Sequence, residues 1–478
     1  MALPLALGFD RASAEAGKST GPNSGWACSR AIDWTGEEVR CEAGAKHAFT
    51  GFEDENDAKP DRVAGAPAGA GGTMNRRGPV SAMTGISLLL PITLTTMAIV
   101  LLTPIVPDLM VRFADVPDHE YWVPMILTLP SLCVALLCPV AGMLGDYFGR
   151  RRLLLFSFLL YAAVGVAPVF LTDLTHILIS RVGVGIAEAL VYVLSTTMIG
   201  DYYRGAARDK WLAAQTAFAS MSALLFFNLG GILGESGWRT PFWAYASALV
   251  MLALVWKFTW EPGKDDAEAA AKRGQGPQSL SWAGFPWARM AMIAAITIYG
   301  SIFFYTVQIQ APSGLAELGL TSPAERGFLT SIASIGVPLG TFFYSRLGTR
   351  WPVGRLLLLE FALLSLGFML MARAGSVTVF LSGCFINQVG AGLLLPTLLV
   401  WSMSILSFEV RGRGTGFWQS AFALGQFLSP VVVTLAGKHA GGLLGAFMIL
   451  SIAAMGGVVI AVAASLGGRS ANGVAAHG

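Results

Sequence analysis

The sequence predicts an all-α polytopic membrane protein with twelve transmembrane helices. Of its 478 residues, 54% are hydrophobic and only 13% are charged, whereas soluble globular proteins carry charge on about a quarter of their residues. From Thr84 onward, apolar runs long enough to cross a bilayer follow one another with short polar breaks. One longer polar stretch divides these runs into two groups of six.

The two groups define the predicted domains. Apolar runs at 84–109, 121–144, 152–171, 174–199, 210–234 and 241–260 form an N-terminal six-helix bundle, 84–260. Runs at 288–311, 327–347, 354–373, 377–406, 415–436 and 442–466 form a C-terminal six-helix bundle, 286–466. Between them, the charged and Gly-rich stretch 261–285 is a predicted cytoplasmic linker, and 467–478 is a predicted cytoplasmic tail.

Residues 1–83 differ from the rest of the chain, because Gly, Ala and charged residues mix there without apolar periodicity. We expect a disordered N-terminal extension, and no signal peptide, since a basic leader and an apolar core are both missing. We slightly favour a true start at Met74 or Met83, with the preceding stretch translated in error. A native peptide from within 17–59, found by mass spectrometry, would contradict that start.

Basic residues gather in the loops on one side of the predicted bundle. The other side carries only five in its short loops, namely Arg112, Arg239, Arg326, Arg373 and Lys438. Cytoplasmic loops of membrane proteins are enriched in Lys and Arg. The sequence therefore predicts a multi-pass protein of the plasma membrane, namely a bacterial inner membrane, with both termini and the linker in the cytoplasm.

A short basic turn, Gly142-Met-Leu-Gly-Asp-Tyr-Phe-Gly-Arg-Arg-Arg152, lies between the second and third runs. Its glycines permit close backbone approach, and Asp146 could pair with an arginine or cap a neighbouring helix. The turn resembles the loop Gly-x-Leu-x-Asp-x-x-Gly-Arg-Arg of the major facilitator superfamily. All of its anchors are present, as Gly142, Leu144, Asp146, Gly149, Arg150 and Arg151.

This resemblance implies two pseudo-symmetric six-helix bundles with a solute bound between them at mid-membrane. An internal repeat points to the same architecture, since the segments 212–219 and 416–423 align without a gap at an offset of 204 residues. The resemblance also implies a cytoplasmic gate, formed by Gly142, Gly145, Asp146, Gly149, Arg150 and Arg151.

Two ionisable residues, Arg181 and Glu188, lie inside the fourth predicted helix. Charged side chains at membrane depth are costly and usually functional. With Gly185 and Tyr192 they share one helical face, which we expect to border a polar cavity. Arg181-x-x-x-Gly185 resembles a fourth-helix motif of the family, which implies that Arg181 and Glu188 serve proton coupling. A static Arg181–Glu188 pair that only orients helices is the alternative.

Other polar residues are predicted to line the substrate cavity, because buried amides and hydroxyls need partners that a substrate can supply. They are Tyr192, Asn228, Tyr299, Tyr305, Gln308, Asn387, Gln388, Trp401, Gln419 and Gln426. Interhelical hydrogen bonding is the alternative for about half of them. Asp108, at the outer end of the first helix, is expected to be a solvated helix-end charge.

The fifth helix departs from an antiporter pattern of the family, Gly-Pro-x-x-Gly-Gly. Gly230 and Gly231 match its end, but Phe226 and Phe227 stand where Gly-Pro would be. This departure weakens the prediction of drug efflux. The chain as a whole is still predicted to be a secondary active transporter that works by alternating access. Proton-coupled efflux of organic compounds or drugs is favoured, and proton-coupled uptake of an organic anion, with Arg181 as its counter-charge, is the alternative.

No enzyme activity, cofactor or metal site is predicted. The five histidines fall in tails or at predicted helix ends, the five cysteines lack metal-ligand spacing, and no P-loop occurs. A sensor or a membrane-embedded enzyme is therefore disfavoured. The expected partners are a small organic substrate, protons and the lipid bilayer, without nucleic acid, and we expect a monomer.

Overall fold

The computed structural model describes residues 81–203, 205–261, 285–406 and 410–474. The predicted extension 1–83, linker 261–285 and tail 467–478 lie mostly or partly outside these residues. All described residues belong to one compact unit, Met74–Gly478.

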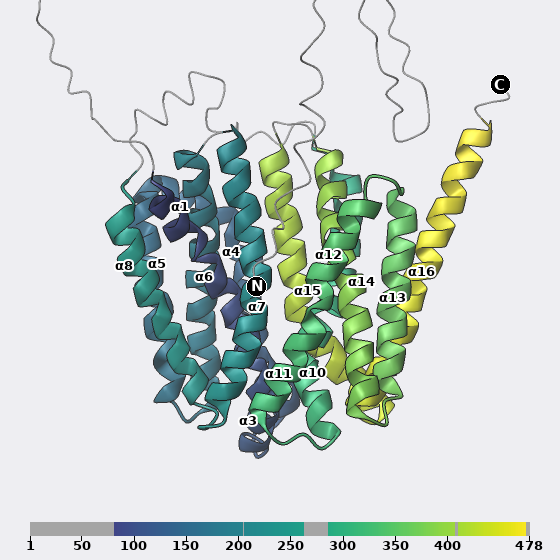
Figure 1. The fold of residues 1–478 in the computed structure, drawn as a ribbon, viewed down its shortest axis with the longest axis horizontal. Coiled ribbons are helices and arrows are strands. Elements are labelled where there is room, and N and C mark those ends of the chain that lie inside the picture. The colour runs from purple at the N-terminus through teal and green to yellow at the C-terminus, as the bar shows by residue number, and fades with distance from the viewer. Residues whose placement is uncertain (1–80, 204, 262–284, 407–409, 475–478) are drawn as a thin grey trace, which may run out of the picture. The chain divides into compact units, whose positions relative to one another are not determined.

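The N-terminal half, Ala82–Phe258, runs back and forth between two faces (purple to teal in Figure 1). Its elements are α1 (Ala82–Leu89), α2 (Ile92–Val100), η1 (Thr103–Ile105), α3 (Val106–Arg112), α4 (His119–Phe148), α5 (Arg150–Val166), η2 (Ala167–Val169), α6 (Leu174–Tyr202), α7 (Gly205–Gly234), η3 (Thr240–Ser247) and α8 (Ala248–Phe258).

Prolines divide the first crossing into four pieces. Pro91 precedes α2, Pro104 lies in η1, and Pro107 opens α3. Proline has no N–H to donate and clashes with the preceding helical turn, which interrupts the regular helical hydrogen bonding at these positions. Together the four pieces still make one apolar crossing, Ala82–Arg112.

The C-terminal half, Trp287–Val474, repeats this arrangement (green to yellow in Figure 1). Its elements are α10 (Trp287–Glu317), α11 (Pro323–Ser334), α12 (Gly336–Leu347), α13 (Val353–Ala372), α14 (Val377–Ser404), α15 (Arg411–Ala440) and α16 (Leu443–Val474).

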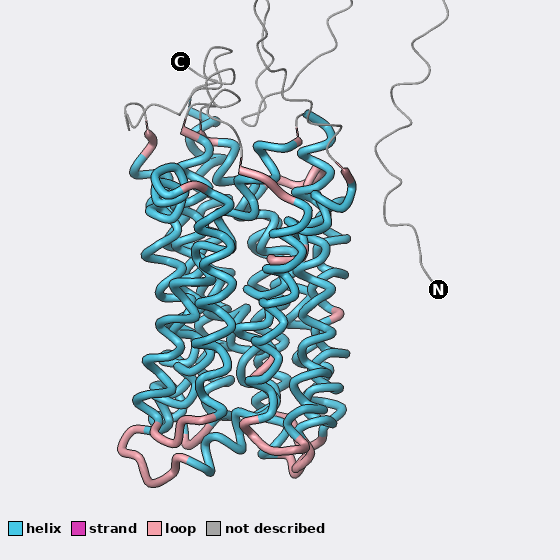
Figure 2. Tube along the Cα trace, turned by 90° about the vertical axis from the view of Figure 1, so that its left-hand side faces the viewer, coloured by secondary structure: helices cyan, strands magenta, loops and turns pink. Residues whose placement is uncertain are grey.

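All regular structure in the described residues is helical (Figure 2). Eleven of their helices are long and apolar enough to cross a membrane, from Ala82–Arg112 to Gly414–Ala440. The apolar helix Leu443–Val459, the first part of α16, is shorter and takes the position of the twelfth predicted crossing. The predicted all-α polytopic fold is therefore confirmed.

Each half has its own hydrophobic core. One cluster is built from side chains between Leu88 and Val255, with Ile309 added from α10, and the second from side chains between Phe285 and Ala461. A third and much smaller cluster joins the halves at mid-depth, where Val134, Cys138 and Ala189 meet Ala423. Two separate cores with a small shared cluster suit two bodies that can rock against each other.

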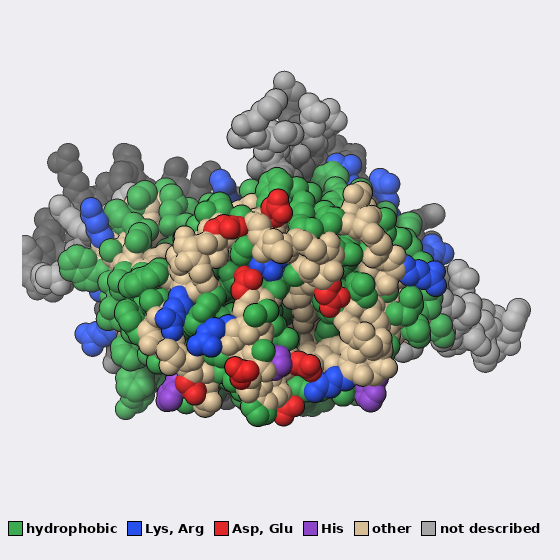
Figure 3. Space-filling view, turned by 90° about the horizontal axis from the view of Figure 1, so that it is seen from below, with side chains coloured by type: hydrophobic (Ala, Val, Ile, Leu, Met, Phe, Trp, Pro, Cys, Tyr) green, Lys and Arg blue, Asp and Glu red, His purple; other side chains and the backbone are tan. Residues whose placement is uncertain are grey.

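The two faces of the bundle differ in their contacts. We call the face at the start of α1, the α4–α5 turn and the end of α8 the linker face. The opposite face, where α3 and α11 lie, carries acidic and basic side chains near its centre (Figure 3). We call it the clamp face, because every polar contact between the halves whose two residues are both described lies there.

Three groups of contacts make up this clamp. Nη2 of Arg326 donates to Oδ2 of Asp108 at 2.8 Å, and the Arg326 side chain is only 2% exposed. Oε1 of Glu235 accepts hydrogen bonds from the hydroxyl of Ser322 at 2.5 Å and the N–H of Ala324 at 3.1 Å. Lys438 reaches Glu120 at 3.5 Å and Asp118 at 4.0 Å. Asp108 remains a partly exposed charge at a helix end, as expected, but it is also an ion-pair partner across the halves.

Glycines bring α7 and α11 together beneath the clamp. A Cβ on Gly327 would lie 2.3 Å from the carbonyl oxygen of Phe227, and one on Gly231 would lie 2.6 Å from that of Pro323. Distances below 3.0 Å do not occur for real Cβ atoms, so both positions require glycine. Gly231, one of the two glycines that match the end of the antiporter pattern, therefore lies at a contact between the halves.

Candidate functional site

A cavity of about 260 Å³ lies between the halves at mid-depth. Both halves line it, through α2, α4, α6 and α7 on one side and α10, α11, α12, α14 and α15 on the other. Its polar lining consists of Thr95, Thr96, Ser131, Glu188, Tyr192, Ser220, Tyr305, Gln308, Ser334, Gln419 and Gln426. Phe304 and Phe422 add aromatic walls. This mixture of apolar walls and a few polar groups is typical of small-molecule sites.

Glu188 is the only charged residue among the described residues that line this cavity. It is the fifteenth of the 29 residues of α6 and therefore lies at the middle of the helix. Its side chain is 5% exposed, and its Oε2 atom is buried without a hydrogen-bond partner. A carboxyl group without partners in an apolar setting must bind a proton or a cation to be stable there.

Amide groups provide a second polar edge. Nε2 of Gln308 donates to Oε1 of Gln388 at 2.7 Å, which leaves Oε1 of Gln308 buried and without a partner at the cavity. Gln388 itself does not line the cavity but orients the amide that does. A bound solute with a donor group could satisfy the free oxygen of Gln308.

Besides Gln388, four more residues predicted to line the cavity lie outside it. Tyr299 donates to the carbonyl of Ala453 on α16, and Asn387 donates to that of Leu364 on α13. Asn228 bonds the preceding turn of its own helix, at the carbonyl of Leu224, and Trp401 packs against the core of the C-terminal half. For Tyr299 and Asn387, the interhelical hydrogen bonding weighed as the alternative is what the structure shows.

Arg181 does not reach the cavity either. Its side chain is fully buried within the N-terminal half, where Nη2 donates to the carbonyls of Gly165 at 3.1 Å and Val164 at 3.3 Å. Its guanidinium lies 4.9 Å from the ring centroid of Tyr245 and 5.1 Å from that of Phe242. Pro168 accounts for this site, because it cannot donate to the carbonyl four residues earlier, at Val164.

Arg181 and Glu188 therefore form no ion pair in this conformation. Seven residues along α6 separate them by about 10 Å, and Gly185 between them packs against α4 at Pro130. The predicted polar face is thus divided: Glu188 and Tyr192 reach the cavity, whereas Arg181 and Gly185 are enclosed in the N-terminal half.

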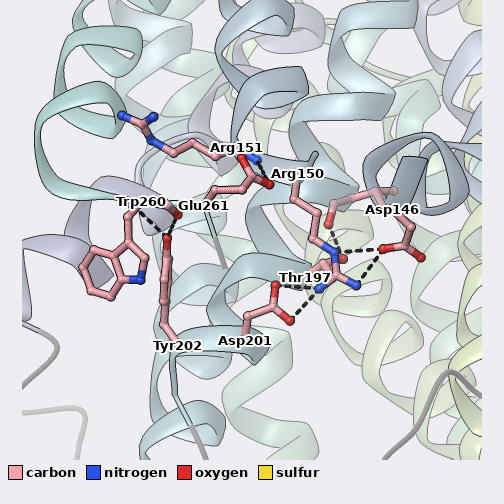
Figure 4. A network of polar contacts seen from close by, with 9 residues as sticks. Asp146, Arg150, Arg151, Thr197, Asp201, Tyr202, Trp260 and Glu261 are labelled. Atoms are coloured by element: carbon pink, nitrogen blue, oxygen red, sulfur yellow. Dashed lines mark hydrogen bonds and ion pairs between the residues drawn. The ribbon is translucent and has the colours of Figure 1, made fainter. Parts of the chain in front are cut away.

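The predicted gate residues form a network at the linker face (Figure 4). Arg150 donates to Asp146 at 2.8 Å and to Asp201 at the end of α6 at 2.5 Å. Gly149 turns the chain between α4 and α5 with φ of +91°, a backbone conformation that favours glycine. Gly145 lies against Leu194, where a Cβ would come within 2.4 Å of its side chain, and Gly142 faces Val193.

The same network extends to the end of α8. Nη2 of Arg151 donates to the carbonyl of Trp256 at 2.8 Å, and the N–H of Arg151 donates to Glu261 at 3.3 Å. The hydroxyl of Tyr202 donates to the carbonyl of Trp260. All of these partners belong to the N-terminal half and the residues directly after α8, so the described part of the network does not join the two halves.

Two further charged residues were not singled out from the sequence as site residues. Glu360 is fully buried in α13 within the C-terminal half, and Arg326 is buried in the clamp. The signal for Glu360 was present, because it stands in the apolar run Leu356-Leu-Leu-Leu-Glu-Phe361, where a charged residue is costly. The pairing of Arg326 with Asp108 joins residues 218 positions apart, which no local pattern reveals.

Comparisons with known proteins agree with this architecture. A sequence model of the Major Facilitator Superfamily matches residues 86–322. A class H tetracycline resistance protein of Pasteurella multocida is 23% identical over 73% of this chain and 87% of its own length. A 3-(3-hydroxy-phenyl)propionate transporter of Escherichia coli K12 is 24% identical over 63% of this chain and 73% of its own.

A solved structure shares the fold. The crystal structure of a bacterial homologue of the human lysosomal transporter Spinster, in an inward-facing and unoccupied conformation, superposes with a TM-score of 0.64. It covers 81% of this chain and 96% of its own at 18% identity. The fold, the loop at 142–151 and these matches define a multi-pass membrane transporter. The chain belongs to the major facilitator superfamily and is not an enzyme.

Proposed function

We propose that this protein exports organic cations in exchange for protons across a bacterial inner membrane. In this proposal the linker face is cytoplasmic, as the positive-inside rule predicts, and the chain works as a monomer. The clamp then closes the external side, so the conformation described here is inward-facing and its cavity receives solute from the cytoplasm.

The observation that carries this proposal is the charge of the cavity lining. Glu188 supplies a carboxyl group, and no lining residue among those described supplies a positive charge. An ionised Glu188 can neutralise a cation, and a protonated one cannot, so proton and cation compete for one group. Such competition couples the proton flux to the cation flux, because the transporter changes conformation with either a proton or a cation bound at Glu188.

Uptake of an organic anion is the second candidate function. It is favoured by the relative whose name states that it transports a hydroxyphenylpropionate. In that case Arg181 would serve as the counter-charge, but its guanidinium is enclosed by Tyr245, Phe242 and backbone carbonyls of α5. The relative named for tetracycline resistance supports export, because a transporter protects a cell by removing the drug.

Alternating access would proceed by rocking of the two halves about the mid-depth cluster of Val134, Cys138, Ala189 and Ala423. Opening to the outside requires the clamp contacts to break and the linker face to close. We propose that the Asp146–Arg150 network at the α4–α5 turn then meets the C-terminal half and stabilises the closed linker face.

Proteoliposomes with an imposed pH gradient test this function. Relative to protein-free liposomes, tetraphenylphosphonium, a lipophilic cation, should accumulate on the acidic side and release protons from it. An aromatic carboxylate such as benzoate crosses the bilayer as the neutral acid, and the protein should not add to this movement. Movement of benzoate with protons faster than in protein-free liposomes would instead establish the uptake function.

We predict that Glu188→Gln abolishes pH-driven accumulation of tetraphenylphosphonium, because glutamine neither ionises nor neutralises a cation. Cation binding, measured on purified protein, should weaken at least about tenfold, equivalent to ~1.4 kcal/mol. Glu325→Gln is the matched control, since Glu325 is exposed at the start of α11. Undiminished accumulation in Glu188→Gln would show that coupling resides elsewhere.

For the gate, we predict that Asp146→Asn lowers transport severalfold while the amount of protein in the membrane is unchanged. Asparagine loses the ion pair with Arg150, and an exposed ion pair of this kind is worth about 0.2–1 kcal/mol. Asp115→Asn, at an exposed position before α4, is the control. Transport by Asp146→Asn at the rate of this control would remove the gate from the mechanism.

A further inference from the structure

Glu360 forms an isolated acidic site inside the C-terminal half, away from the cavity. It lies on α13, seven residues after the helix begins at Val353, which is about 10 Å from the linker face. Its side chain has no exposed surface, and its Oε2 atom has no hydrogen-bond partner. Among the described residues no basic side chain pairs with it, so an ionised Glu360 would be a bare charge in an apolar core.

The helices around Glu360 supply few polar groups. From α14, which packs along α13 (Figure 1), the hydroxyl of Thr397 contacts Oε1 at 2.5 Å. The phenol of Tyr344 on α12 lies within electrostatic range. From α16, the described residues Leu443–Val459 include no titratable side chain. On α14 the titratable side chain is that of Cys384. It lies 13 residues before Thr397 in the sequence, and its thiol contacts Met371.

The hydrogen atoms around Thr397 can be counted. Its Oγ1 lies 2.5 Å from Oε1 of Glu360 and 2.9 Å from the carbonyl oxygen of Leu393. A carboxylate and a carbonyl only accept hydrogen bonds, whereas a hydroxyl has a single hydrogen to donate. With Glu360 ionised, one of the two contacts has no hydrogen. With Glu360 protonated, the acid donates to Thr397, Thr397 donates to Leu393, and both contacts are satisfied.

We infer that Glu360 is a second proton-binding site, occupied by a proton in this conformation and discharged when α13 and α14 separate enough to admit water. On discharge, the O–H bond of the carboxylic acid breaks and the proton passes to water. The hydroxyl of Thr397 then turns from Leu393 to the carboxylate. The bound proton does not depend on the proposed function, but its part in transport does.

Infrared spectroscopy tests the bound proton directly. Purified Glu188→Gln protein, in which the cavity carboxyl is absent, should show the carbonyl stretch of a protonated carboxylic acid at neutral pH. The band should vanish when Glu360→Gln is added, because this substitution removes the carboxyl group. The glutamine amide can donate to Thr397 as the acid does, so the packing is preserved. A spectrum unchanged by Glu360→Gln at neutral pH would overturn the inference.

Thr397 supplies a second arm that does not remove the acid. Thr397→Val deletes the hydroxyl at nearly constant shape and should shift the band to higher frequency, since the acid loses its hydrogen-bond partner. Thr397→Ser keeps the hydroxyl and should leave the band in place. Equal spectra for the valine and serine variants would contradict the described contact and with it the inference.

Transport gives a separate readout. In proteoliposomes, Glu360→Gln should lower the number of protons exchanged per tetraphenylphosphonium ion by one, measured from accumulation at a series of pH gradients. If the number of protons exchanged per tetraphenylphosphonium ion is unchanged while the infrared band is present, Glu360 is permanently protonated. That result would overturn the inference that Glu360 releases its proton during transport. If the wild-type protein moves no tetraphenylphosphonium, the proposed function fails, while the infrared result still decides the proton site.

Discussion

At the residue scale, the clearest contrast is between Arg181 and Glu188, which share one face of α6. The sequence predicted correctly that Glu188 lies at mid-depth, because depth follows from the position in the helix. It could not predict that Arg181 turns into the N-terminal half. That outcome depends on the carbonyl of Val164 in α5, which Pro168 of η2 leaves free, and on two aromatic rings from η3. Pairings of this kind form between distant segments and leave no local pattern.

The enclosure of Arg181 leads to a stability prediction. Arg181→Lys should lower the free energy of unfolding by about 1.5–3 kcal/mol, because lysine lacks the planar guanidinium that lies over two rings while its Nη2 donates to two carbonyls. Thermal unfolding in detergent measures this change, and Arg112→Lys, at an exposed position at the end of α3, is the control. Equal melting temperatures for the two variants would show that the guanidinium geometry is unimportant.

At the element scale, apolar run length predicted the helices well, and their contacts poorly. The runs locate twelve crossings because a bilayer admits little besides helices. Among the predicted cavity residues, Tyr305 and Gln419 lie at the cavity between the halves. Tyr299 and Asn387 instead bond to neighbouring helices. Helix rotation, which decides between these outcomes, is set by packing with partners that the sequence does not identify.

The crossing of α7 and α11 allows a prediction about conformation. Gly327→Val should favour opening of the clamp face by about 1–3 kcal/mol, because the added atoms overlap the backbone of Phe227. Spin labels at Thr172 and Gly375, exposed on the clamp-face loops of the two halves, would report a longer distance.

Gly200→Val provides the matched control for this crossing, since nothing lies within 4 Å of a Cβ at that position of α6. Its label distance should equal that of the wild-type protein. A Gly327→Val distance that also equals the wild-type value would mean that α7 and α11 do not hold the clamp closed.

At the scale of the whole molecule, the clamp gives the conformational equilibrium a dependence on pH. The Ser322 hydroxyl and the Ala324 N–H donate to Glu235, which holds the pKa of this carboxyl below its usual value. Because the pKa of Glu235 is lowered in the closed clamp, its contacts stabilise that state fully at pH values above the ordinary pKa of glutamate. This stabilisation is lost as the pH falls through the lowered pKa of Glu235. Acid on the clamp face therefore favours opening toward that side.

We predict a longer Thr172–Gly375 label distance in the acid range, below about pH 4.3, the ordinary pKa of glutamate. Glu235→Gln keeps an acceptor for Ser322 and Ala324 but cannot titrate, so it should reduce the acid-induced change. An identical pH profile in Glu235→Gln would assign the effect to other carboxyls of the clamp.

The single carboxyl of the cavity also fixes an electrical property of the cycle. If one proton on Glu188 replaces one monovalent cation, no net charge crosses the membrane, and the voltage across it cannot drive export. Discharge of Glu360 in the same cycle would add one unbalanced charge, and each such charge gains about 2.3 kcal/mol per 100 mV. Export would then draw on the membrane potential as well as on the pH gradient, and a current carried by the protein would count the carboxyls that discharge.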